Sequence, residues 1–79
     1  MQEETIVVLR DYGRVRLKLK ELMDSRGINR NALARSIGAR FEVVDKWYQG
    51  NVEKLDLDIL ARLCCVLHCR VEDLLEYGK

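Results

Sequence analysis

The spacing of apolar positions changes near residue 20, and this change separates two kinds of predicted structure. Residues 5–9, Thr-Ile-Val-Val-Leu, are apolar and β-branched, and residues 11–13, Asp-Tyr-Gly, are typical of a turn. Residues 14–19 then alternate basic and apolar side chains. We therefore expect a short strand over 5–9 that pairs with a second strand after the turn.

The second strand has a competing interpretation as part of a helix. Apolar residues also recur at the spacing of one helical face, at Val15, Leu19, Leu22 and Met23. The first helix could therefore begin near Arg14, although we favour the hairpin. By about Lys20 the pattern is helical, and the helix is expected to end at Gly27, where a missing Cβ permits a left-handed turn.

Two short helices should follow, each ended by a glycine. Asn29 is a good N-cap for a helix over 30–37, because its side-chain oxygen can accept a backbone N–H of the first turn, and Gly38 ends that helix. The next helix is predicted over 41–49 and ends at Gly50. Its cap is weak, since Arg40 occupies the position where Ser or Thr would serve.

The last third of the chain predicts a core helix and a short final helix. Asp56 should cap a fourth helix, which ends in a left-handed turn at His68. Its apolar stripe contains Leu60, Leu63, Cys64 and Leu67. A fifth helix over Val71–Glu76 is expected to bury Val71, Leu74 and Leu75.

Length and composition fit a single all-α domain of five helices that carries a short N-terminal β-strand or hairpin. Seventy-nine residues are too few for two hydrophobic cores. The 48% hydrophobic and 34% charged residues, with no proline, are typical of a helix-rich globule and exclude a disordered or fibrous chain. We divide the chain into a β arm over 1–17 and a helical domain over 18–79.

The net charge of +1 hides an uneven distribution along the chain. Residues 10–46 contain ten Lys or Arg and five Asp or Glu, a net charge of +5, whereas residues 1–9 and 47–79 each carry −2. A mixed-charge surface that is merely solvated could produce this pattern. The basic first half is also the pattern expected of a nucleic-acid-binding surface.

Several functional classes find no support in the residues. The longest apolar runs span only a few residues, against the roughly 20 of a membrane helix, and the acidic N-terminus is unlike a secretion signal. We therefore expect no membrane association. Three cysteines within residues 64–69 make a poor disulfide framework, which favours a reducing cytoplasm.

The cysteines and His68 raise the question of a metal site. Cys64 and Cys65 point about 100° apart on one helix, and Cys64 belongs to the apolar stripe. We therefore interpret the thiols as structural, with Cys65 the more exposed, and predict no metal and no cofactor. The sequence contains no nucleophile elbow, phosphate loop or paired His and carboxylate, so we do not expect an enzyme.

Residues 30–47 have the residue types that a helix-turn-helix requires at fixed offsets. A small residue is needed where the second helix crosses the first, a glycine at the turn, and apolar anchors on the inner side of the second helix. Counted from Arg30, the offsets 3, 4, 7, 8, 14 and 17 hold Leu33, Ala34, Ile37, Gly38, Val44 and Trp47. No single match is informative, but the set predicts this motif.

The stretch GINRNALARSIGARFEVVDKWYQG, residues 27–50, resembles the helix-turn-helix of the lambda repressor and Cro family. Residues 55–77 resemble the fourth and fifth helices of small stand-alone bacterial members, so the resemblance covers about 60 of the 79 residues. It implies a five-helix, lambda-repressor-like fold that binds double-stranded DNA. The helix over 41–49 would then lie in the major groove.

The resemblance also implies which side chains meet DNA. Arg40, Phe41, Glu42 and Lys46 would face the bases. In such an arrangement lysine can donate to guanine, glutamate can accept from cytosine N4, and an apolar side chain can touch a thymine methyl. Arg30 matches the family position that contacts a phosphate, and Gln49 and Lys54 are further candidates for phosphate contacts.

The sequence departs from the family pattern at three positions. Glu42 and Asp45 place two carboxylates on a helix that must approach phosphates, and Phe41 stands where a polar residue is commoner. The leading hypothesis is nevertheless a homodimeric repressor, because operators of this family are usually two-fold symmetric and one small module contacts little DNA. The apolar arm from Thr5 to Leu17 is expected to contribute to the dimer interface. The alternative is a protein-interaction module, such as an antitoxin that binds a toxin or another regulator.

Overall fold

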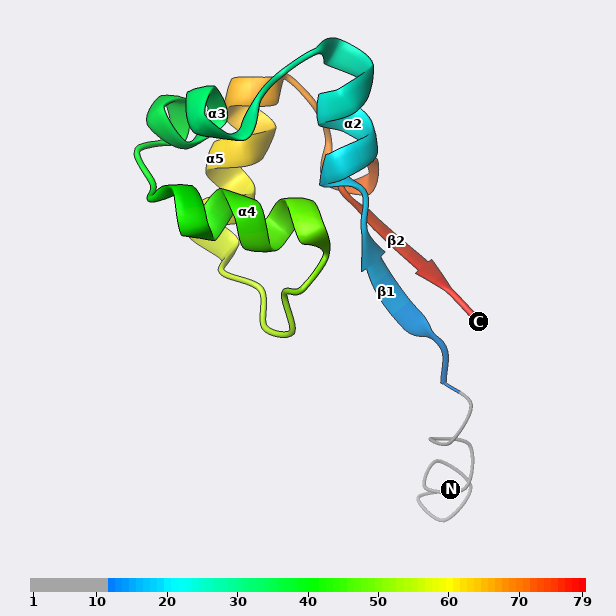
Figure 1. Cartoon of the computed structure of the whole chain (residues 1–79). Helices are drawn as coiled ribbons and strands as arrows, with labels where there is room; N and C mark the ends of the chain where they lie inside the picture. The colour runs from blue at the N-terminus through cyan, green and yellow to red at the C-terminus, as the bar shows by residue number, and fades with distance from the viewer. Residues whose placement is uncertain (1–11) are drawn as a thin grey trace.

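In the computed structural model, which describes residues 12–79, four α-helices form a globule from which a two-stranded ribbon projects (Figure 1). The elements in chain order are β1 (Arg14–Leu17), α2 (Leu19–Arg26), α3 (Arg30–Ile37), α4 (Phe41–Gln49), α5 (Leu57–Leu67), the 3-10 helix η2 (Val71–Asp73) and β2 (Leu75–Gly78). The expected class, a mainly helical fold with a short N-terminal strand, is confirmed.

The predicted helix ends are confirmed by their capping contacts. The Asn29 side chain accepts a hydrogen bond of 2.7 Å from the amide of Ala32, and Asp56 accepts from the amides of Asp58 and Ile59. No side chain caps α4 at Arg40. His68 ends α5 in the left-handed region at φ 51°, as predicted.

The prediction of a fifth α-helix over Val71–Glu76 is wrong. Only residues 71–73 are helical, as a 3-10 turn, and the chain then extends as β2. β2 pairs antiparallel with β1, from Leu17 opposite Leu75 to Arg14 opposite Gly78. This long-range pairing satisfies the backbone groups of residues 75–78, which a short exposed helix would leave to water.

The burial expected for this segment is correct at one position of three. Leu74 is fully buried, Leu75 is half-buried and Val71 is 47% exposed. Leu74 also accepts a 2.8 Å hydrogen bond at its carbonyl from the amide of Lys18. This bond joins the end of β1 to the start of β2 beside the core.

The second strand of the expected N-terminal hairpin is present. Residues 14–17 form a strand, so α2 begins at Leu19 and the alternative start near Arg14 is wrong. Among the described residues the partner strand of β1 is β2, at the other end of the chain. The predicted strand over Thr5–Leu9 lies outside the described residues.

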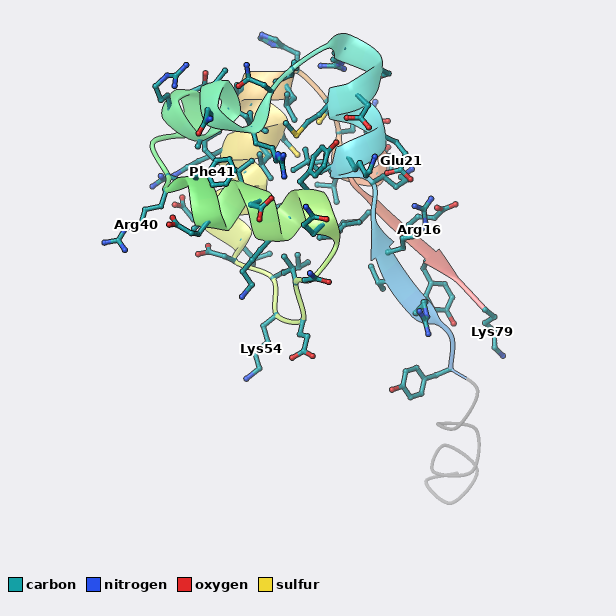
Figure 2. The ribbon with its side chains drawn as sticks, in the orientation of Figure 1. Arg16, Glu21, Arg40, Phe41, Lys54 and Lys79 are labelled. Atoms are coloured by element: carbon teal, nitrogen blue, oxygen red, sulfur yellow. The ribbon has the colours of Figure 1, made fainter. Side chains whose placement is uncertain are left out.

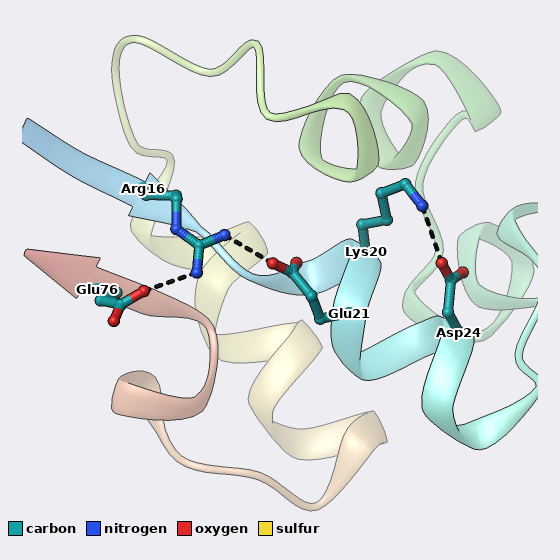
Figure 3. Close-up of polar contacts among 5 residues, drawn as sticks. All are labelled: Arg16, Lys20, Glu21, Asp24 and Glu76. Carbon is teal, nitrogen blue, oxygen red and sulfur yellow. Dashed lines mark hydrogen bonds and ion pairs between the residues drawn. The ribbon is translucent and has the colours of Figure 1, made fainter.

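Arg16 connects the ribbon to the helices (Figure 3). Its guanidinium forms ion pairs of 2.6 Å with Glu21 on α2 and 2.7 Å with Glu76 on β2. The two hydrogen-bonded carboxylates, Glu21 first, raise the pKa of Arg16, and Arg16 lowers the pKa of Glu21. Exposed ion pairs stabilise a fold little, so their main effect here is to orient the ribbon.

The core gathers side chains from all four α-helices and the segment before β2. Its members are Leu19, Met23, Leu33, Ala34, Ile37, Val44, Trp47, Leu60, Leu63, Leu67 and Leu74. Trp47 is 3% exposed, which confirms its expected place in the core, on the inner side of α4. Cys64 is half-buried at the edge of the core and Cys65 is exposed. Among residues 12–79, no helix has the length and apolar character needed to cross a bilayer.

Candidate nucleic-acid interface

Helices α3 and α4 pack closely on each other through a tight turn. Ala34 on α3 is 4% exposed and Val44 on α4 is 1% exposed, and both belong to the core. A small side chain at position 34 lets the two helices approach. The apolar residues selected by their offsets are all buried: Leu33, Ala34, Ile37, Val44 and Trp47.

The turn between the two helices depends on Gly38 and on a side chain from α5. Gly38 has φ +69° and ends α3, and the amide of Ala39 donates a 3.0 Å bond to the carbonyl of Ala34. Arg62 of α5 donates 3.0 Å from Nη1 to the carbonyl of Ile37, and its Nη2 pairs with Asp58 at 2.8 Å. The end of α3 is therefore capped by another helix, which holds the crossing in place.

The outer side of α4 carries the residues predicted to face bases. Arg40, Glu42 and Lys46 are exposed, and Phe41 is 38% exposed. Figure 2 shows Arg40 extending from the N-terminal end of α4 and Lys54 from the loop beyond its C-terminal end. The helix thus presents an outer face that is polar apart from Phe41, while its opposite side anchors it in the core.

Arg30, the predicted phosphate contact at the start of α3, is held against α4. Its Nη1 lies 2.6 Å from Oδ1 of Asp45, and both side chains are a little over one third exposed, at 38% and 35%. Its guanidinium also lies over two aromatic rings, 5.6 Å from the centre of Phe41 and 4.7 Å from that of Tyr48. Such cation–π contacts favour a fixed guanidinium plane.

Tyr48 extends these contacts to α2. Its hydroxyl donates a 2.8 Å hydrogen bond to Asp24, and Lys20 pairs with the same carboxylate at 3.0 Å (Figure 3). These bonds, with Lys20 the larger cause, lower the pKa of Asp24, while Asp24 raises the pKa of Lys20. Lys20 also lies 5.3 Å from the Tyr48 ring centre.

Gln49 and Lys54, the other phosphate candidates, have different surroundings. Gln49 donates from Nε2 to Oδ1 of Asp45 at 3.4 Å, the same oxygen that pairs with Arg30. Lys54 is exposed in the loop after α4, on the rim of a depression of about 230 Å³ that it shares with Lys46. The floor of this depression is apolar and includes Val52 and Ile59.

Sequence reasoning missed the partners of the predicted residues. From the sequence, Asp45 is only an unfavourable charge, and no pattern assigns a role to Tyr48 or Arg62. Asp45 and Arg30 lie fifteen positions apart on different helices, beyond the reach of any local pattern. The spacing of Phe41, Asp45 and Tyr48, at i, i+4 and i+7, was the available signal that all three share one face of α4.

Within the described range 12–79, no three His, Cys, Asp or Glu side chains are grouped so that they could hold a metal ion. Cys69 is half-buried, and burial together with the neighbouring Cys64 thiol raises its pKa to about 11. The three cysteines are free thiols.

The packed helices α3 and α4, the glycine turn and the outward polar face define a helix-turn-helix protein. Residues 18–79 match the sequence model of the Cro/C1-type HTH DNA-binding domain, and the chain belongs to that family. The resemblance to the lambda repressor and Cro family is thereby confirmed. No curated protein matches the sequence.

A solved structure with the same fold matches this chain. It is the crystal structure of a protein from Bacteroides fragilis, provisionally described as DNA-binding, and it superposes with a TM-score of 0.70. The match covers 80% of this chain and 100% of that one at 16% sequence identity. At that identity the likeness concerns the fold alone.

Proposed function

We propose that this protein is a sequence-specific double-stranded-DNA-binding transcriptional regulator that acts as a homodimeric repressor. The observation that carries the proposal is the exposed outer face of α4, with Arg40, Phe41, Glu42 and Lys46 outward and Val44 and Trp47 buried beneath. A helix anchored in this way can enter the major groove without disturbing the core.

Each outward side chain can form a specific contact with a base edge or a neighbouring phosphate. The ammonium of Lys46 donates to guanine O6 and N7, the carboxylate of Glu42 accepts from cytosine N4, and the ring of Phe41 packs against a thymine methyl. Arg40, at the N-terminal end of α4, is long enough to reach a neighbouring base or phosphate. Together these contacts would distinguish a short base sequence.

Phosphate contacts come from residues on either side of α4. Arg30 lies at the N-terminus of α3, where the helix dipole also favours an anion. Gln49 and Lys54 lie at the other end of α4 and in the loop that follows. These residues would set the position of α4 in the groove through the DNA backbone and would contact no base edge.

The β1–β2 ribbon is the proposed site of dimerisation, together with the rest of the N-terminal arm. Val15 and Tyr77 lie opposite each other across the ribbon and are each 62% exposed. Within residues 12–79 the sheet has two strands, and an isolated two-stranded ribbon is marginal in water. A strand edge without a partner invites pairing with a further strand. A second copy of the chain would cover these apolar side chains and supply the two-fold symmetry that operators of this type require.

Two measurements test the proposal. A gel shift with the DNA upstream of the protein's own gene, repeated over a range of salt concentrations, should show tight binding that weakens steeply as salt rises. Deletion of residues 1–12 followed by measurement of the mass in solution tests the arm. An unchanged dimer mass would rule out a contribution of that segment to the interface.

A protein-interaction role is the second candidate, and an exposed apolar pair favours it. Leu57 at the start of α5 is 72% exposed and Leu55 is 41% exposed. Their chain neighbours Lys54 and Asp56 line the depression next to α4. Leu57→Ser should abolish binding to a toxin-like or regulatory partner and leave DNA binding intact. The free thiols agree with the reducing cytoplasm that we propose as the compartment for either role.

A further inference from the structure

Asp45 places a carboxylate in the middle of the face of α4 that we propose reads DNA. Its side chain is 35% exposed, and its Oδ1 accepts from Nη1 of Arg30 at 2.6 Å and from Nε2 of Gln49 at 3.4 Å. A negative charge at this position opposes the approach of phosphates. Its contacts are nevertheless with two of the three residues proposed to bind phosphate.

The guanidinium of Arg30 is fixed in orientation by a set of contacts that all come from one stripe of α4. Phe41 and Tyr48 face its plane at 5.6 and 4.7 Å, and Asp45 lies between them in sequence. Tyr48 is itself fixed by its hydrogen bond to Asp24. A long side chain that would otherwise sample many rotamers is therefore confined near one.

We propose that Asp45 is a specificity-determining residue of the DNA-binding face and acts through Arg30. It holds the guanidinium in one orientation and offsets its charge, so that phosphates in general are bound weakly. Tight binding then requires a duplex on which the base contacts of α4 and the oriented Arg30 are satisfied together. This inference rests on the proposed DNA binding.

The ion pair does not have to break for Arg30 to reach a phosphate. A guanidinium has five N–H donors, and the bond to Asp45 uses Nη1. With its side chain 38% exposed, Arg30 can direct a second donor outward while it stays paired. A phosphate placed to accept from that donor is favoured, and a phosphate elsewhere meets the carboxylate.

The test compares Asp45→Asn with Glu53→Gln, which removes the same charge from the exposed loop after α4. Both variants and the wild-type chain are titrated by fluorescence anisotropy. One duplex is enriched by the wild-type protein from a random pool, and the other has a random sequence. We expect Asp45→Asn to bind the random duplex about fivefold more tightly than the wild-type chain does. The ratio of the affinity for the enriched duplex to that for the random duplex should fall about tenfold. Glu53→Gln should raise the affinity for both duplexes by the same factor and leave the ratio of the two affinities unchanged.

A double-mutant cycle assigns the effect to Arg30. In an Arg30→Ala background, Asp45→Asn should alter the ratio no more than Glu53→Gln does. A ratio that falls equally in both single variants, or that still falls without Arg30, overturns the inference and leaves the proposed function standing. A wild-type chain that binds no duplex overturns the proposed function, and the inference with it.

Discussion

The hydroxyl of Tyr48 on α4 donates a 2.8 Å hydrogen bond to the carboxylate of Asp24 on α2, and so connects the proposed recognition helix to the first helix of the domain. Because hydrogen bonding favours the charged carboxylate, this bond contributes to the lowered pKa of Asp24, after the larger contribution of Lys20. Tyr48→Phe should therefore raise the pKa of Asp24 toward its ordinary value of 3.8 without reaching it. An NMR titration of the Asp24 carboxyl measures this change.

The sign of the stability effect follows from the same shift. A carboxyl whose pKa is lower in the folded state stabilises the fold above its ordinary pKa, and this stabilisation is lost as the pH falls through the folded value. Tyr48→Phe should therefore flatten the acid limb of the stability curve. Tyr77→Phe is the control, because the Tyr77 hydroxyl donates to the carbonyl of Tyr12 and is remote from Asp24. An Asp24 pKa that shifts equally in both variants would contradict the assignment.

Ala34 tests whether the crossing of α3 and α4 depends on a small side chain. It is 4% exposed within the core, so Ala34→Leu must displace neighbouring side chains and should destabilise the protein by about 1–3 kcal/mol. Urea unfolding followed by circular dichroism gives this value. Ala61→Leu on the exposed side of α5 adds the same volume and should change the free energy of unfolding by less than about 0.5 kcal/mol. Equal losses for the two variants would show that the crossing tolerates bulk.

The helical part of the fold was predictable because its signals are local. The Asn29 and Asp56 caps, the glycine at position 38 and the left-handed His68 each act within a few residues, and all are found where the sequence places them. The final strand was missed for the opposite reason. Residues 71–76 carry apolar side chains at helical spacing, and only their pairing with β1, sixty positions away, makes residues 75–78 extended.

The candidate site shows the same division. The outward residues of α4 follow from the periodicity of one helix, together with the burial of Val44 and Trp47. The partner of Arg30 does not, because Arg30 and Asp45 meet only after two helices have packed. Considered on α4 alone, Asp45 is an unfavourable negative charge on a face that approaches phosphates. Its contact with Arg30 on α3 gives it a proposed role.

The pairing of β1 with β2 depends on the absence of a side chain at Gly13. Its φ is +81°, and a Cβ at this position would lie 2.4 Å from the carbonyl oxygen of Gly78, so Gly13→Ala adds a backbone clash to the cost of the left-handed conformation. We expect the β1–β2 pairing to open and dimerisation to weaken. Hydrogen exchange at the β1 amides and sedimentation velocity measure the two effects. Gly27→Ala is the control, since its φ is +66° with no atom within 4 Å of the added Cβ, and the ribbon should persist in that variant.

The three thiols should react in an order set by exposure and pKa. Cys65 is exposed, whereas burial raises the pKa of Cys69 to about 11 and leaves little thiolate near neutral pH. A maleimide reagent at pH 8, followed by peptide mass spectrometry, should therefore label Cys65 first and Cys69 last. The Cys65→Ser variant should lose the fast phase only. Rapid labelling of Cys69 in the folded protein would contradict a half-buried thiol that is protonated at pH 8.

Lys46 and Arg30 should fail in different ways when they are shortened, because one is proposed to read bases and the other to contact a phosphate. Lys46→Ala should reduce the preference for the selected duplex over a random one by roughly 5- to 150-fold, the equivalent of about 1–3 kcal/mol. Arg30→Ala should weaken binding to both duplexes and lower the slope of log affinity against log salt by about one. Both variants should keep the helical circular dichroism spectrum, because Lys46 is exposed and Arg30 lies outside the core. Equal losses on both duplexes for both variants would refute the separate roles.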